Sequence, residues 1–192
     1  MASWCSTALV SSAFLGALLF TGCAGKPVLP SLGVVPQFTL IDQTGAEFKS
    51  AAALDKKIWV ANFVFTNCPG PCPRMSSQMH QVQTALAGEN DVRFVSFTVD
   101  PARDTPPVLS AYAQHFEATP GKWFFLTGAA PDLNRMSRGV FMLGDVDGSL
   151  EHSTRFALID RLARIRGYYQ SSAADAIPAL IADAERLLKE SL

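Results

Sequence analysis

The chain has 192 residues, of which 48% are hydrophobic and 17% charged, so it is long enough to bury the core of one globular domain. Its formal net charge is −1 at pH 7. The sequence contains no run of basic residues, which excludes the electrostatic signature of a nucleic-acid-binding protein, because phosphate binding needs clustered Lys and Arg.

The first part of the chain, residues 1–22, predicts an export signal. It has no charged side chain, is apolar from Ala8 to Phe20, and ends in a small-residue site before Cys23. This arrangement is similar to a lipoprotein signal, in which cleavage before Cys23 and lipidation of its thiol tether the mature protein to a membrane. The alternatives are an uncleaved N-terminal anchor and a plain secretory signal. In each case the domain is exported, and an anchored form faces the periplasm or the cell exterior.

Residues 23–35 are rich in Pro and Gly and predict a linker, which leaves residues 36–192 as the folded domain. Within that domain, runs of β-branched and aromatic residues alternate with segments of helical period. Strands are predicted at Phe38–Ile41, Lys57–Phe65, Arg93–Val99, Trp123–Leu126, Phe156–Ile159 and Ala163–Tyr168, and helices at Pro73–Leu86, Pro106–Phe116, Asp132–Arg138 and Asp175–Leu188.

The alternation of strands and helices predicts an α/β domain with a central mixed sheet flanked by helices. The last two strands predict a late antiparallel hairpin. This order fits a thioredoxin-like fold. In the first long helix, Met75, Met79, Val82 and Leu86 share one face, which favours core packing over copper ligation by methionine.

Several charged residues have structural interpretations. Arg161, Arg164 and Arg166 lie in an alternating segment, which predicts the solvated outer face of a strand. Asp104 lies just before two prolines and is predicted to cap the following helix rather than to take part in chemistry. Asp100 follows a predicted strand at the sheet edge where ligands bind, and is a candidate for orienting a ligand or contacting a partner.

Two cysteines carry the functional prediction. Cys5 lies in the signal and Cys23 would be lipidated, which leaves Cys68 and Cys72 as the free thiols of the domain. They lie where a buried strand turns into a helix, and the free N–H groups and dipole of a helix N-terminus predict lowered thiol pKa values. A structural disulfide is disfavoured because so small a loop removes little entropy from the unfolded chain.

The Cys-x-x-x-Cys spacing is compatible with electron exchange or with a soft metal. Structural zinc would need four ligands, whereas copper(I) accepts two sulfurs and one imidazole. His80 lies about two helical turns beyond Cys72, and His115 ends a helix, where it can interact with terminal carbonyls. His152 ends a Gly-containing loop directly before a strand, a position that suits either a ligand or a local hydrogen-bonding residue.

Four motifs together resemble those of the Sco/SenC family of thioredoxin-like copper proteins. They are FTNCPGPCP, VDPARDTP, KWFFLTG and HSTRFALID, in this order between Phe65 and Asp160. The resemblance implies that Cys68, Cys72 and His152 bind copper and that the protein helps to assemble the binuclear copper centre of cytochrome c oxidase. Gly70 and Pro71 depart from the family, which commonly has an acidic and then an aliphatic residue between the cysteines.

The leading hypothesis is therefore a monomeric, membrane-anchored copper chaperone. Its expected partners are the copper-site subunit of cytochrome c oxidase and periplasmic copper or thiol donors. The alternative is a thiol–disulfide oxidoreductase in which Cys68 attacks a partner disulfide and Cys72 resolves the mixed disulfide, without a need for His152. A redox sensor is a further alternative. A peroxidase is disfavoured because the cysteine loop itself offers neither an Arg nor a hydroxyl group to polarise the peroxide bond.

Overall fold

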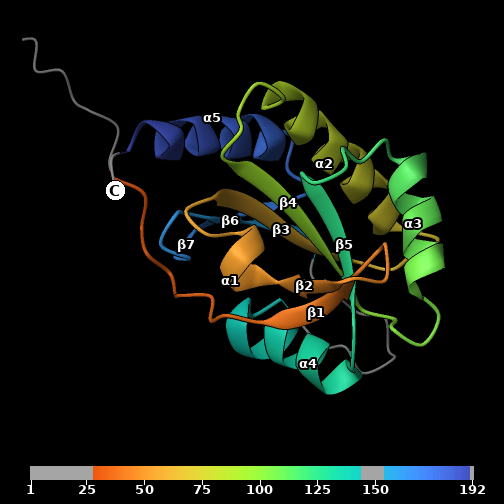
Figure 1. The fold of residues 1–192 in the computed structure, drawn as a ribbon. Coiled ribbons are helices and arrows are strands. Elements are labelled where there is room, and N and C mark those ends of the chain that lie inside the picture. Colours follow the sequence, from red (N-terminus) through yellow and green to blue (C-terminus); the bar gives the residue numbers. More distant parts are fainter. Residues whose placement is uncertain (1–27, 144–153, 191–192) are drawn as a thin grey trace, which may run out of the picture.

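A mixed seven-stranded sheet organises the computed structural model, which describes residues 28–143 and 154–190 (Figure 1). The strand order is β2-β1-β5-β4-β3-β6-β7, with β3, β4 and β5 parallel and the other pairs antiparallel. The strands are β1 Thr39–Asp42, β2 Glu47–Lys49, β3 Ile58–Val64, β4 Val92–Thr98, β5 Trp123–Thr127, β6 Arg155–Ile159 and β7 Ile165–Gln170. The helices are α1 Ser50–Ala53, α2 Pro71–Ala85, α3 Pro106–His115, α4 Ala130–Asn134, the π-helical turn η1 Arg135–Val140, and α5 Ala176–Lys189.

Helices cover both faces of the sheet. Helices α2, α3 and α5 pack on one face, where they cover Ile58 and Val60 of the central strand β3. On the other face α4 and η1 cover Trp59 and Phe63 of the same strand. Every residue of β3 is therefore buried, as expected for a strand that is covered on both sides. The predicted α/β class and the late antiparallel hairpin, β6 with β7, are confirmed.

The predicted strands and helices are present, with ends shifted by a few residues. The sequence missed β2 and α1, because elements of three and four residues are too short to show a period. Helix α2 begins at Pro71, two residues earlier than predicted, because the first turn of a helix tolerates proline. All four residues of its predicted core face are buried: Met75, Met79, Val82 and Leu86.

The prediction of a solvated arginine face is wrong for Arg166, which is only 4% exposed. Its guanidinium pairs with Asp160 at 2.9 Å and with Glu190 at 3.1 Å. It also donates hydrogen bonds to the carbonyls of Leu29 and Pro30. These partners offset the cost of removing the guanidinium from water. Through them Arg166 connects the N-terminal segment, the β6–β7 turn and the end of α5.

Part of the predicted linker lies along the edge strand β7. Val34 forms a β-bridge with Arg164, and the N–H of Leu32 donates to the carbonyl of Ile165 at 2.8 Å. The predicted signal and Cys23 lie outside the described residues. Among the residues that the structure describes, no helix has the length and apolar character to cross a membrane.

Candidate metal centre

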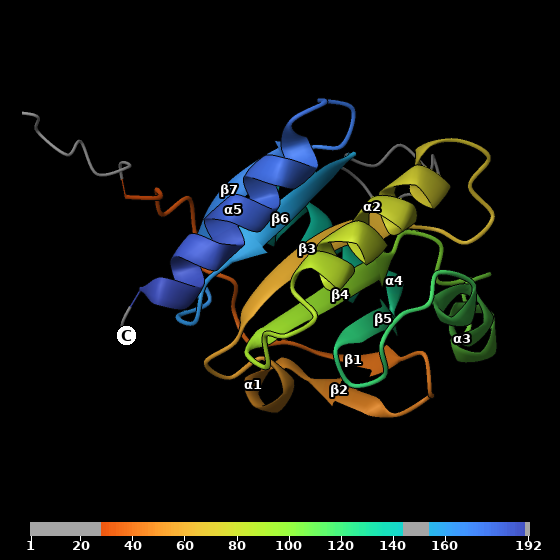
Figure 2. The same ribbon diagram turned by 90° about the horizontal axis from the view of Figure 1, so that it is seen from above.

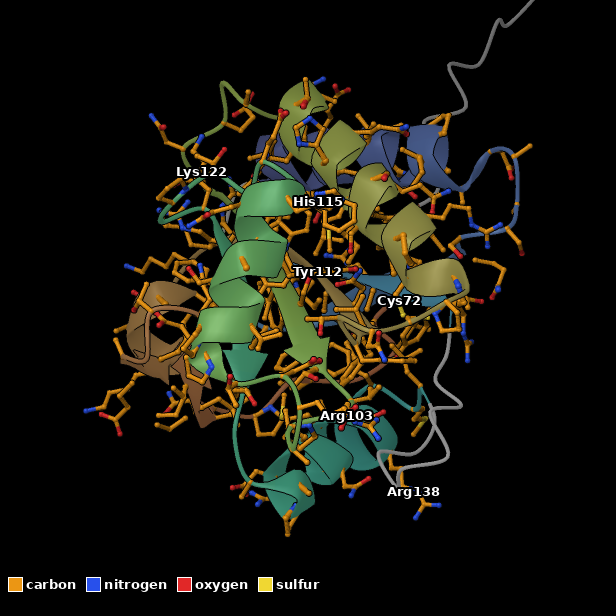
Figure 3. All side chains as sticks on the ribbon, turned by 90° about the vertical axis from the view of Figure 1, so that its right-hand side faces the viewer. Cys72, Arg103, Tyr112, His115, Lys122 and Arg138 are labelled. Carbon is orange, nitrogen blue, oxygen red and sulfur yellow. The ribbon has the colours of Figure 1, made fainter. Side chains whose placement is uncertain are left out.

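The two cysteines lie in the loop that joins β3 to α2, with Cys72 in the first helical turn. Cys68 is 8% exposed and Cys72 is fully buried, and both are free thiols. The backbone N–H of Cys68 donates to the carbonyl of Phe65, which folds the loop back on the end of the strand. Figure 3 shows Cys72 at the start of α2, on the side of the molecule that also carries α3. The two predicted sulfur ligands therefore lie at the carboxyl end of the central strand.

The prediction of a lowered thiol pKa is wrong for Cys72. Burial raises the pKa of the Cys72 thiol far above its ordinary value, and its hydrogen bond with Cys68 raises it further. A backbone hydrogen bond at Phe65 lowers the pKa, but by less than burial raises it. The free-energy cost of desolvating the thiolate is thus larger than the stabilisation that a helix N-terminus is expected to give it. Without a bound cation Cys72 is a neutral thiol, and a soft metal would replace its proton.

Asp104 holds the cysteine loop in place. It is 1% exposed, and its carboxylate accepts hydrogen bonds from the backbone and the hydroxyl of Thr66 and from the hydroxyl of Thr98. The N-cap of α3 is instead Thr105, which forms no side-chain capping bond. The predicted capping role of Asp104 is therefore wrong. Since β3 and β4 are parallel neighbours, the carboxylate joins the two chain segments where both strands end.

The other acidic candidate, Asp100, lies nearer the surface. Its side chain is 12% exposed and pairs with Arg103 at 2.9 Å. Its backbone N–H donates to the hydroxyl of Thr98, which is the residue that also binds Asp104. Asp100 is thus connected to the cysteine loop through Thr98 and Asp104.

Tyr112 is a neighbour of the cysteines that the sequence did not predict. Its hydroxyl lies 3.0 Å from the hydroxyl of Ser76, across the contact between α3 and α2. The pKa of Tyr112 is raised to about 12: burial is the largest cause, the bond with Ser76 lowers the pKa, and the charges of Cys72, Cys68 and Asp104 raise it. Tyr112 is therefore a neutral phenol at the contact between α3 and α2. The position of Tyr112 in its helix did not predict this neighbourhood, because the contact between α3 and α2 joins residues that are far apart in the sequence.

His80 and His115 lie together away from this loop. They border a surface pocket of about 360 Å³ with Glu117, whose carboxylate is 3.9 Å from Nε2 of His80. His115 packs edge-on against Phe116. In the described ranges 28–143 and 154–190, no three His, Cys, Asp or Glu side chains are placed to hold one metal ion.

His152, the predicted third ligand, lies in residues 144–153, outside the described residues. The strand that follows it is described. Ala157 of β6 pairs with Ala61 of β3, so the antiparallel register places Arg155 beside the carboxyl end of β3. The chain just after His152 is therefore at the same end of the sheet as the cysteine loop.

Residues of strand β7 contact the chain on both sides of residues 144–153. The hydroxyl of Tyr168 donates to the carbonyl of Phe141 at 2.9 Å, and its ring lies under the guanidinium of Arg155, 5.5 Å from the ring centre. The side chain of Gln170 donates to the hydroxyl of Thr154 at 2.6 Å. Tyr168 thus contacts the chain before and after residues 144–153.

Comparison with known proteins identifies the family of this chain. The SCO1/SenC family model matches residues 30–189. The chain belongs to the SCO1/SenC family. The SCO1 protein homologue of Bacillus subtilis is 38% identical over 113 residues. The match covers 58% of this chain and 58% of that relative, so the chain spans little more than half of the relative's length. A putative copper-binding protein of Stutzerimonas stutzeri is 31% identical over 75% of this chain and 72% of its own length.

Solved structures confirm the fold of this SCO1/SenC chain. A SCO1/SenC family lipoprotein from Bacillus anthracis matches with a TM-score of 0.76 and 32% identity, over 85% of this chain and 100% of the other. BsSco is a member of the Sco family of cytochrome c oxidase assembly proteins in which a disulfide switch was identified. Its structure matches with a TM-score of 0.74 and 27% identity, over 85% of this chain and 99% of the other. The predicted thioredoxin-like family fold is thus confirmed.

Proposed function

We propose that this SCO1/SenC protein binds copper(I) through Cys68, Cys72 and His152 and delivers it to the copper-site subunit of cytochrome c oxidase. The observation that supports this most is the buried pair of free thiols beside the strand that follows His152. Thiolate sulfur and imidazole nitrogen suit a soft cation of low coordination number. The donor set fits copper(I) better than zinc, which would need a further ligand to close a structural site.

Relatives support both the cargo and the recipient. A relative that covers three quarters of this chain is named as a putative copper-binding protein, and BsSco belongs to a family of cytochrome c oxidase assembly proteins. The structural relative from Bacillus anthracis is a lipoprotein, which supports an anchor at Cys23 for this exported chain. The domain would then act as a membrane-tethered chaperone.

The difference in exposure between the two thiols supports an order of metal transfer. Cys68 is 8% exposed, whereas Cys72 is fully buried, so an incoming thiolate from the recipient would first replace Cys68. Cys72 would leave last. Its sulfur would then take up a proton, because burial favours the neutral thiol over the thiolate. Each broken copper–sulfur bond would be matched by one formed with a recipient thiol, which would give up the proton that the freed cysteine takes up; the bond to His152 would break as the ion leaves, and no electron would be transferred.

Copper(I) titration against a competing chelator tests the proposal. Cys68→Ser should abolish tight binding, and His152→Ala should weaken it by at least about tenfold, because each removes a ligand. His115→Ala is the matched control and should bind like the wild type, since His115 lies against Phe116 in a separate pocket. Unchanged binding in Cys68→Ser and His152→Ala would contradict the assignment.

A second candidate function is reduction of a partner disulfide. It is favoured by the free Cys68–Cys72 pair, in which Cys68 is the more exposed. The Cys68 thiolate would attack the disulfide and release one partner thiolate, and Cys72 would then attack Cys68, release the second, and leave a Cys68–Cys72 disulfide. The raised pKa of Cys72 slows the second step. His152→Ala separates the two functions, because a reductant should keep its reduction potential and activity. A redox sensor would use the same pair.

Tyr168 should position the segment that carries His152. Tyr168→Phe removes the hydrogen bond to Phe141 and leaves the ring under Arg155. Copper(I) affinity should fall by about three- to tenfold, because groups that orient a ligand tune its binding. Tyr169→Phe is the matched control: it also loses one hydrogen bond, to Asp183, and should leave affinity unchanged. Equal copper affinities in the two variants would contradict this role.

A further inference from the structure

A groove of about 550 Å³ lies between helices α2 and α5. Figure 2 shows the two helices side by side on one face of the sheet, and both begin at the same end of the molecule. One wall of the groove is polar and the other is apolar. The polar wall is formed by three residues of α2: Arg74, Gln78 and Gln81. The apolar wall is formed by three residues of α5: Ile177, Pro178 and Ile181. These six residues define what we name the α2–α5 groove.

The α2–α5 groove opens at the cysteine end of the sheet. Strand β7 is antiparallel to β6, and β6 is antiparallel to β3, so β7 and β3 end at the same end of the sheet. Ser171 follows β7 directly and lines the groove. Its carbonyl accepts a hydrogen bond from Gln78 at 2.9 Å, and its backbone N–H donates to the carbonyl of Thr154 at 2.8 Å. Since Thr154 lies two residues after His152, the groove adjoins the strand that follows the proposed histidine ligand.

The polar wall follows one face of α2. Residues 74, 78 and 81 are four and three positions apart, so their side chains share a face over two helical turns, roughly 10 Å along the axis. An extended peptide spans that length with about three residues. The side chain of Gln81 is exposed and has no hydrogen-bond partner among the described residues. Its amide can donate to and accept from peptide groups, so the groove suits an extended peptide with an apolar side chain against α5.

Arg74 gives the α2–α5 groove its charge. It is exposed, and it is the one charged residue among those that line the groove. Within the described part of the chain, its guanidinium forms one hydrogen bond, to the hydroxyl of Ser171 at 3.4 Å, and no ion pair. A bond of that length is weak, so the guanidinium can turn to bind a carboxylate in a bidentate manner. Asp175 follows the loop beside the groove but does not line it. The expected occupant therefore carries a carboxylate.

We propose that the α2–α5 groove binds an extended segment of the copper recipient, with a carboxylate of that segment paired to Arg74. The proposal rests on the proposed function and names the docking site for it. Transfer by thiol exchange needs the recipient sulfur beside the copper ion, so the recipient chain must cross the cysteine end of the sheet. Arg74 lies two residues beyond Cys72, roughly 3 Å along the helix axis. The bound segment would hold the recipient thiol close to the centre.

Hydroxyl-radical footprinting of the full chain, reduced and free of copper, tests where the recipient docks. The probe is the reduced, copper-free copper-site domain of cytochrome c oxidase from the organism that makes this chain. Labelling of Pro178 and Ile181 should fall by about threefold or more when the domain is added, because a bound segment excludes solvent from the apolar wall. Val34 and Leu162 are exposed at the opposite end of the sheet and should label equally with and without the domain.

Calorimetric titration with the same domain tests the role of Arg74. Arg74→Glu should weaken binding by about tenfold or more, because it replaces attraction of the carboxylate by repulsion. Arg135→Glu is the matched control. It changes the net charge equally at an arginine whose side chain is 68% exposed and lies outside the groove, and it should bind within about twofold of the wild type. Lysine in place of the responsible Asp or Glu of the recipient should restore binding to Arg74→Glu.

The possible results separate docking from copper binding. Arg74→Glu should keep the wild-type copper(I) affinity in the chelator titration, because Arg74 is not a proposed ligand. A domain that binds Arg74→Glu as tightly as the wild type, that leaves Pro178 and Ile181 fully labelled, or that does not bind at all overturns the docking proposal. Protection that rises with the concentration of the chain alone would show that a second copy fills the groove, and would also overturn it. Tight copper binding by Cys68→Ser would instead contradict the proposed function, whatever the domain does.

Discussion

Replacement of Arg166 by methionine should lower the free energy of unfolding by about 3 kcal/mol, because it removes one partner of a buried ion pair. Methionine keeps the apolar stem but leaves the 5%-exposed Asp160 without its most buried cation and Glu190 without a partner. It also frees the carbonyls of Leu29 and Pro30. Urea unfolding gives the loss in stability, and hydrogen exchange should show faster exchange in residues 32–35.

Arg164→Met is the matched control for this prediction. Arg164 pairs with the same carboxylate at 2.8 Å, but its side chain is 40% exposed. Exposed ion pairs contribute little, so its loss should cost less than about 1 kcal/mol. Equal losses for the two arginines would show that burial of Arg166 is not what stabilises the ion pair.

The ion pairs of Asp160 with Arg164 and Arg166 make the free energy of unfolding depend on pH. Burial disfavours the Asp160 carboxylate, but hydrogen bonds from the Arg164 backbone and from the Arg166 and Arg164 side chains outweigh burial and hold its pKa below its usual value. The folded state therefore binds this proton less readily than the unfolded state. The stabilisation is fully present above about pH 4 and is lost as the pH falls through the lower, folded-state pKa. The difference in unfolding free energy between the wild type and Asp160→Asn should shrink in that range only.

Asp104→Ala should cost about 3 kcal/mol and should also weaken copper(I) binding. The substitution leaves the backbone N–H of Thr66 and the hydroxyls of Thr66 and Thr98 without their acceptor, and buried donors without partners carry their full desolvation cost. Thr66 lies two residues before Cys68, so the cysteine loop loses the link through Asp104 to Thr98 of β4. Urea unfolding and the chelator titration measure the two effects.

Asp100→Ala controls for the loss of a nearby carboxylate. Its partner Arg103 is exposed, with 68% of its side chain accessible, so the pair should contribute less than about 1 kcal/mol. Copper affinity should change little. If Asp100→Ala weakened copper binding as much as Asp104→Ala, the general negative charge of this region would matter rather than the attachment of the loop.

The sequence predicted what depends on neighbours along the chain. The periods of two and of 3.6 residues located the strands and the long helices, and the turn after β3 located Cys68 and Cys72. Arg166 and Asp104 were misjudged because their partners are distant: Leu29 lies 137 residues from Arg166, and Thr66 lies 38 residues from Asp104. The Cys72 pKa was misjudged for a related reason. A helix N-terminus is visible in a sequence, whereas the depth at which it is buried is not.

The pairing of β6 with β3 determines how the connection before β6 can vary in length. Three backbone partnerships, from Trp59 with Ile159 to Ala61 with Ala157, fix where β6 lies along β3. Residues gained or lost before position 153 would change the length of the connection but not the place of β6. A slip of one residue in the ladder would instead move it by about 3.3 Å and turn each side chain to the opposite face. The ladder therefore fixes where β6 begins, so the connection before it can diverge in length without moving Arg155 away from the carboxyl end of β3.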